Sequence, residues 1–79
     1  MPKRIRVENM TVTTTPAQVL AGFDNFGSIT RCQLEFDDEG ASTGVAHVEF
    51  ASTQAGAAAI ASMNEKPFNG ATIRVREDA

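Results

Sequence analysis

The chain has 79 residues, which is enough for one domain and too few for a second hydrophobic core. Hydrophobic residues make up 42 % of it, which argues against disorder, and no apolar run approaches the roughly 20 residues that a membrane-spanning helix needs. The formal net charge of −3 argues against a nucleic-acid ligand unless the basic residues gather on one face.

The single cysteine, Cys32, excludes an internal disulfide and a cysteine-based zinc site. This fits an intracellular, reducing compartment, with nucleus, cytoplasm and organelle left open. Residues 1–4 contain no signal-peptide hydrophobic region. We find no nucleophile–base constellation, metal cluster or phosphate-cradling glycine loop, so we expect neither an enzyme nor a bound metal or cofactor.

The first third of the chain predicts a strand and a helix. Apolar and charged residues alternate over 5–8, the period of a half-buried strand. A helix should begin after Thr15 as N-cap, with Pro16 in its first position and Gln18 completing a capping box. It should end near Gly27, which can adopt a left-handed cap. Its buried stripe would consist of Val19, Leu20 and Phe23.

Two strands should follow, separated by an acidic loop at 37–42. Four residues of the second strand should face inward: Ile29, Cys32, Leu34 and Phe36. The third strand, 45–50, alternates cleanly. Its inward side would carry Ala46, Val48 and Phe50, and its outward side Val45, His47 and Glu49. Cys32 and His47 would then lie on opposite faces, and we expect Cys32 to be a core residue.

The last third predicts a second helix and a final strand. Ser52 can cap a helix with a buried stripe at Gly56, Ala59, Ile60 and Met63. A glycine in mid-helix indicates close approach to the sheet or to the first helix. Asn69-Gly70 is a turn signal, and Ile73 and Val75 alternate with polar residues in a last strand.

The resulting order, β-α-β-β-α-β in about 80 residues, favours an α+β ferredoxin-like sandwich. Residues 1–79 would form a single domain with a four-stranded antiparallel sheet and two helices on one face. The other face would be open to solvent or to a partner.

Several segments resemble the RNA-recognition-motif family. Residues 43–50 resemble its eight-residue signature, K/R-G-F/Y-G/A-F-V-x-F/Y, at Gly44, Ala46, Val48 and Phe50. Residues 5–10 resemble the six-residue signature, and 26–29 the "FG-x-I" segment before the second strand. The "LNG-x-x-L-x-G" segment has counterparts at Met63, Asn64, Phe68 and Gly70. The resemblance covers nearly the whole chain, which we expect to be one domain of a longer protein.

The departures from the family pattern fall on its RNA-contacting positions. In the family, bases stack on aromatics at positions that here hold Arg6, Val45 and His47, and Thr43 replaces the leading basic residue. Base–aromatic stacking contributes roughly 1–3 kcal/mol per base, so losing two platforms would weaken binding by about 2–6 kcal/mol. The resemblance therefore implies an atypical member with reduced RNA affinity.

Basic residues nevertheless gather where RNA would lie. Lys3 and Arg4 are expected in an N-terminal arm, and four arginines on the open face, where Glu8, Glu35 and Glu49 also lie. Such a surface could hold phosphates and stack a base on a guanidinium, or it could be a solvated sheet with cross-strand ion pairs. The candidate RNA-binding residues are Lys3, Arg4, Arg6, Arg31, Gln33, Val45, His47, Arg74 and Arg76.

Two functions are consistent with these features. The first is weak, low-specificity binding of single-stranded RNA in RNA processing or metabolism, and similarity to messenger-RNA export adaptors of this fold points the same way. The second is protein interaction through the helical face or through Lys66 and Phe68, which resemble the Arg-x-Phe of the splicing-factor homology motifs.

Overall fold

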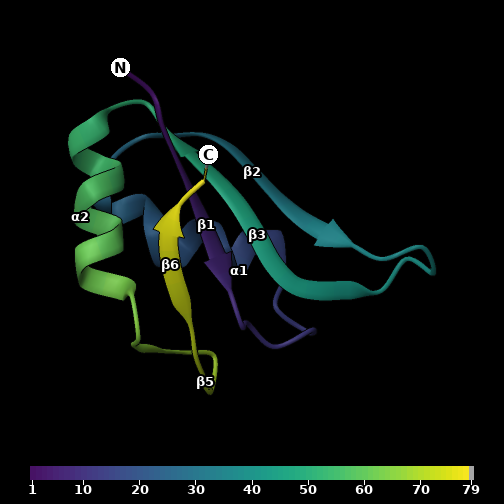
Figure 1. Ribbon diagram of the computed structural model, residues 1–79. Helices are drawn as coiled ribbons and strands as arrows, with labels where there is room; N and C mark the ends of the chain where they lie inside the picture. The colour runs from purple at the N-terminus through teal and green to yellow at the C-terminus, as the bar shows by residue number, and fades with distance from the viewer. Residues whose placement is uncertain (79) are drawn as a thin grey trace.

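The computed structural model describes residues 1–78 (Figure 1). Its elements, in chain order, are β1 (Lys3–Glu8), α1 (Pro16–Phe23), the 3₁₀ turn η1 (Asp24–Phe26), β2 (Ile29–Phe36), β3 (Ser42–Phe50), α2 (Thr53–Met63), β4 (Pro67–Phe68), β5 (Ala71–Thr72) and β6 (Arg74–Glu77). No helix among the described residues is long and apolar enough to cross a membrane.

Four strands form one antiparallel sheet in the order β2-β3-β1-β6. Both helices pack on the same face of this sheet, with α1 under β2 and α2 against β1 and β6 (Figure 1). The short strands β4 and β5 form a separate hairpin through the turn at Asn69-Gly70, where both residues have positive φ. The predicted α+β ferredoxin-like sandwich is confirmed.

The core lies between the sheet and the helices. Ile5 and Val7 of β1 are fully buried, as is the alternating set Ala46, Val48 and Phe50 of β3. The helices contribute Val19, Phe23, Ala55 and Ala59, and β6 contributes Val75. The residues that alternate with them, such as Arg4, Arg6, His47 and Glu49, therefore point to the open face.

The predicted helix starts are confirmed. The Thr15 hydroxyl accepts a hydrogen bond from the Gln18 backbone N–H (3.2 Å), and the Gln18 side chain accepts one from the Thr15 N–H (3.0 Å). Ser52 caps α2 by accepting from the Ala55 N–H at 3.1 Å. The predicted left-handed cap at Gly27 is wrong: its φ is +154° and its ψ −179°, and a Cβ there would lie 2.6 Å from the Ala55 Cβ. Gly27 is needed because α2 packs closely against it.

A bulge in β2 explains its uneven spacing of apolar residues. Ile29 lies opposite Phe50, but Arg31 lies opposite Glu49, so Thr30 is an extra residue. The bulge keeps Ile29 and Cys32 on the helix side although they are three residues apart. It also directs Arg31 to the open face.

Two residues predicted to be buried are exposed. Phe36 is 57 % exposed, because the β2–β3 hairpin extends beyond the layer covered by the helices (Figure 1). Leu20 is 39 % exposed, because the buried side of α1 is narrow and consists of Val19 and Phe23.

Two glycines mark close approaches. Gly56 lets α2 approach β1 so closely that a Cβ would collide with the side chain of Lys3, which confirms the predicted close packing against the sheet. Gly44 has a φ of +81°, and a Cβ there would lie 2.6 Å from the carbonyl oxygen of Met10. The Gly44 carbonyl also accepts a hydrogen bond from the Met10 N–H (3.0 Å), which ties the end of β1 to β3.

Candidate nucleic-acid interface

The open face of the sheet centres on β1 and β3. Strand pairing places Arg6 opposite His47 and Arg4 opposite Glu49. On the outer side of β1, Arg76 lies opposite Arg6 and Arg74 opposite Glu8. Val45 is half-buried on the outward side of β3. The structure thus brings together on one face most of the residues predicted to contact RNA.

Glu8 holds two of the arginines. Its carboxylate accepts hydrogen bonds from Arg76 (Nε at 2.9 Å and Nη2 at 3.2 Å) and from Arg6 (Nε at 2.9 Å). The hydrogen bonds from Arg76, and then those from Arg6, lower the pKa of Glu8 from 4.5 to about 2. Arg6 and Arg76 therefore share a single carboxylate in the free protein.

Glu49 forms a second, smaller group. The Thr30 hydroxyl donates to its Oε1 at 2.8 Å, and Arg4 Nε donates to its Oε2 at 3.3 Å. These contacts, with Thr30 contributing most, lower the pKa of Glu49. The Arg76–Glu8 and Arg4–Glu49 ion pairs cross between neighbouring strands, as the mixed charge of this face suggested, whereas Arg6 and Glu8 pair within β1.

His47 lies between two carboxylates. Its Nδ1 is 2.7 Å from Asp78 Oδ2, and its Nε2 is 3.4 Å from Glu35 Oε1. The histidine side chain remains 33 % exposed. Asp78 was not predicted as a partner of His47. The only feature of the sequence that could have indicated this contact is an acidic residue two positions after Arg76.

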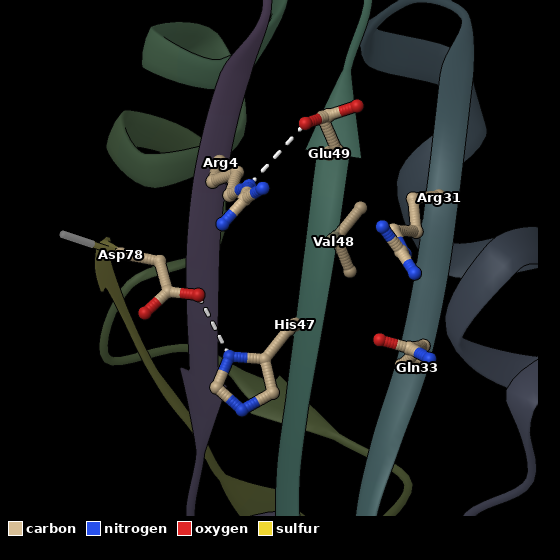
Figure 2. A pocket seen from close by; sticks show the side chains of 7 residues that line it. All are labelled: Arg4, Arg31, Gln33, His47, Val48, Glu49 and Asp78. Carbon is tan, nitrogen blue, oxygen red and sulfur yellow. Dashed lines mark hydrogen bonds and ion pairs between the residues drawn. The ribbon is translucent and has the colours of Figure 1, made fainter.

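A hollow of about 360 Å³ lies beside His47 (Figure 2). It is lined by Arg4, Arg31, Gln33, His47, Val48, Glu49 and Asp78. Figure 2 shows Arg31 and Gln33 rising from β2 on one side, and Asp78 closing the other side against His47. Within residues 1–78, neither Arg31 nor Gln33 has a side-chain hydrogen bond or ion pair. Their donors therefore remain available to a ligand.

Arg74 is the second available cation. It is exposed on β6, and it makes no ion pair with any other described residue. Lys3 differs: it is the first residue of β1 rather than part of an arm, and it pairs with Glu77. Its side chain passes along Gly56 of α2, so it lies on the helix side. The expectation that Lys3 and Arg4 lie in an N-terminal arm is wrong, because β1 begins at Lys3, earlier than predicted.

The alternative protein-binding residues lie away from this face. Phe68 packs edge-on against Phe23, with ring centroids 5.9 Å apart, and contacts Gly22 of α1. Lys66 is exposed in the segment between α2 and β4. The packing of Phe68 leaves only part of its ring accessible, which does not favour capture of an aromatic side chain.

Cys32 lies on the helix side of the sheet, half-buried against the core, and burial raises the pKa of its thiol. It therefore faces away from His47, as predicted. Among the described residues, no group of histidine, cysteine and acidic side chains is arranged to hold a metal ion.

Comparisons with known proteins agree with this architecture. The chain resembles the RRM of Rna15 solved with bound RNA (GU), with a TM-score of 0.86 and 21 % identity over 96 % of this chain and 82 % of that one. It also resembles the second RRM of the yeast poly(U)-binding protein Pub1, with a TM-score of 0.88 and 24 % identity over 98 % and 94 %. RNA-recognition domains 1 and 2 of Sex-lethal from Drosophila melanogaster give a TM-score of 0.90 and 24 % identity over 98 % and 50 %. At these identities the likeness shows the fold alone.

The family model described as "RNA recognition motif" matches residues 5–74, which include both helices, β2 and β3 in full, most of β1 and the first residue of β6. The chain belongs to the RNA-recognition-motif family.

Proposed function

We propose that this domain binds single-stranded RNA on its open sheet face, weakly and with low sequence specificity, as part of RNA processing or metabolism. Family membership supports RNA as the ligand class. The observation that carries the proposal is the placement of Arg31 and Arg74, two arginines without carboxylate partners among residues 1–78, on that face.

Arg31 and Arg74 flank the middle of the sheet, where the other arginines are already paired with carboxylates. Arg31 lies on β2 and Arg74 on β6, the two outer strands, with β1 and β3 between them. A strand of RNA crossing the sheet would meet a free guanidinium at each side, and each can bind a phosphate in bidentate fashion. Arg4, Arg6 and Arg76 are already paired with Glu49 or Glu8, so each should contribute less to phosphate binding than Arg31 or Arg74.

Low affinity and low specificity follow from the position of the aromatic residues. The chain has five phenylalanines and neither tryptophan nor tyrosine. Phe23 and Phe50 are buried, Phe26 and Phe68 pack against the core, and Phe36 lies at the far end of the β2–β3 hairpin. RNA bases therefore have no phenylalanine, tyrosine or tryptophan platform at the centre of the face, and stacking normally contributes about 1–3 kcal/mol per base.

The test is fluorescence anisotropy with labelled single-stranded homopolymers of uridine, adenosine and cytidine at low salt. We expect micromolar or weaker binding, with affinities that differ by less than about tenfold between homopolymers. Changing Arg31 and Arg74 together to alanine should weaken binding to all of them by a similar factor, because phosphate contacts carry no sequence information.

Lys66→Ala is the matched control, since it removes one positive charge away from the sheet face. It should leave affinity nearly unchanged. A sharp preference for one homopolymer would refute low specificity. An equal loss from Lys66→Ala would refute RNA binding by this face through its arginines.

A further inference from the structure

Asp78 is placed to control access to the open face. It follows directly after β6, and its backbone N–H donates to the carbonyl of Arg4 at 3.1 Å. This bond continues the antiparallel pairing of β6 with β1 by one residue. The Asp78 side chain therefore lies on the open face, like those of Arg74 and Arg76, and its carboxylate reaches His47 Nδ1 at 2.7 Å. The Asp78 side chain is only 19 % exposed, so it is packed into the surface rather than free in solvent.

The contact between Asp78 and His47 lies at the hollow in the open face. His47 occupies the fifth position of the eight-residue signature, and its ring lines the hollow together with Arg31 and Gln33. Asp78 closes that hollow on the side of β6 (Figure 2). A nucleotide that enters the hollow would meet the imidazole and the carboxylate together, because the two groups contact each other there.

In the free protein, each ring nitrogen of His47 already contacts a carboxylate. The polar and charged residues on its own and neighbouring elements are Arg6 on β1, Arg31, Gln33 and Glu35 on β2, Glu49 on β3, and Arg76 and Asp78 from the end of the chain. Two of these acids contact the ring directly, and one of them, Asp78, comes from beyond the last strand. An RNA phosphate near His47 would be repelled by Asp78, and a base would have to displace it.

We propose that Asp78 is an autoinhibitory gate on the RNA-binding face: its carboxylate occupies His47 and adds negative charge to the wall of the hollow until RNA displaces it. This inference rests on the RNA-binding function proposed above and adds a specific regulating residue to it. Part of the free energy of RNA binding is then spent on breaking the Asp78–His47 contact, which contributes to the low affinity.

The experiment measures uridine homopolymer affinity for the full chain and for Asp78→Ala at low salt. The alanine keeps the backbone N–H that bonds to Arg4 and removes only the carboxylate. We expect affinity to rise by about three- to tenfold, which corresponds to about 0.7–1.4 kcal/mol. Glu65→Gln removes the same amount of charge from an exposed site between α2 and β4, and it reports the effect of net charge alone.

A second comparison tests whether the gate acts through His47. In a His47→Ala background, Asp78→Ala should raise affinity by less than it does with His47 present, because the ring that holds the carboxylate is already absent. In the wild-type protein, NMR signals of the His47 ring should shift in the same direction on RNA addition as on the Asp78→Ala change.

The outcomes separate the two proposals. RNA binding that Asp78→Ala improves no more than Glu65→Gln, or improves equally in both histidine backgrounds, would overturn the gate and leave RNA binding intact. Absence of RNA binding in the wild type and in Asp78→Ala alike would overturn both. A gain specific to Asp78 and dependent on His47 supports the gate.

Discussion

Arg6 on β1 and His47 on β3 lie directly opposite each other at the centre of the open face. In the family pattern these two positions hold aromatics that stack on bases. Here each side chain contacts a carboxylate in the free protein: Arg6 contacts Glu8, and His47 contacts both Asp78 and Glu35. A ligand for this face must therefore compete with ion pairs and hydrogen bonds that the protein already makes.

Binding should depend steeply on salt. If Arg31 and Arg74 each neutralise a phosphate, the logarithm of affinity should fall with the logarithm of salt concentration by about 0.7 per phosphate contacted. The double change of both arginines to alanine should reduce that slope by about 1.4, and Lys66→Ala should not alter it. Anisotropy titrations between 25 and about 200 mM salt measure these slopes. Binding that is insensitive to salt would contradict the phosphate contacts.

Restoring aromatic platforms should strengthen binding. Val45 and His47 project from the open face, so Val45→Phe with His47→Phe should leave the fold intact at a small cost from the lost contacts of His47. At roughly 1–3 kcal/mol per stacked base, RNA affinity should rise by at least about tenfold. Anisotropy gives the affinity, and circular dichroism checks folding.

Two results would count against this reasoning. A folded double variant with unchanged affinity would mean that RNA does not approach the centre of the sheet. A variant that fails to fold would mean that these two side chains are needed for packing, in conflict with their outward placement.

Two glycines with the same backbone angle should respond differently to alanine. Gly40 has a φ of +82° with open space around it, whereas Gly44 has a φ of +81° and Met10 oxygen 2.6 Å from the site of a Cβ. Gly40→Ala should cost only the strain of a left-handed alanine, about 1–2 kcal/mol. Gly44→Ala should cost an additional 1–3 kcal/mol or so, because β1 and β3 must move apart.

Urea denaturation of the two variants measures this difference directly, since each is the control for the other. Equal loss of stability would show that the Met10–Gly44 approach is not tight.

Glu8 should make the stability of the folded domain depend on pH in the acidic range. Its pKa is lower in the folded protein, about 2, than the ordinary 4.5 of an unfolded chain, so folding favours its charged form. The stabilisation is complete above about pH 4.5 and is lost as the pH falls from there toward 2. Glu8→Gln should therefore lower the melting temperature at pH 7 and flatten its decline below pH 4.5.

Glu65→Gln is the control for this prediction, because Glu65 is exposed and forms no ion pair with residues 1–78. It should retain the parent pH profile. If both variants follow the same curve, the ion pairs of Glu8 do not stabilise the folded domain.

Much of the fold could be predicted because short-range patterns determine it. The alternation in β1 and β3, the capping box at Thr15 and the Asn69-Gly70 turn all act within a few residues. The register between strands could not be predicted in the same way. It decides that Glu8 binds both Arg6 and Arg76, and that Asp78 reaches His47. Phe36 was misplaced because the alternation of β2 continues past the point where the helices cover it.

The extra residue Thr30 also affects how the domain meets other copies of itself. β2 is an outer strand, and its free edge could pair with a strand of another chain. The bulge between Ile29 and Arg31 interrupts the regular spacing of backbone donors and acceptors along that edge. The opposite edge, β6, is only four residues long and carries Arg74 and Arg76. Both margins of the sheet therefore resist strand addition, so the open face can stay exposed for a ligand without edge-to-edge aggregation.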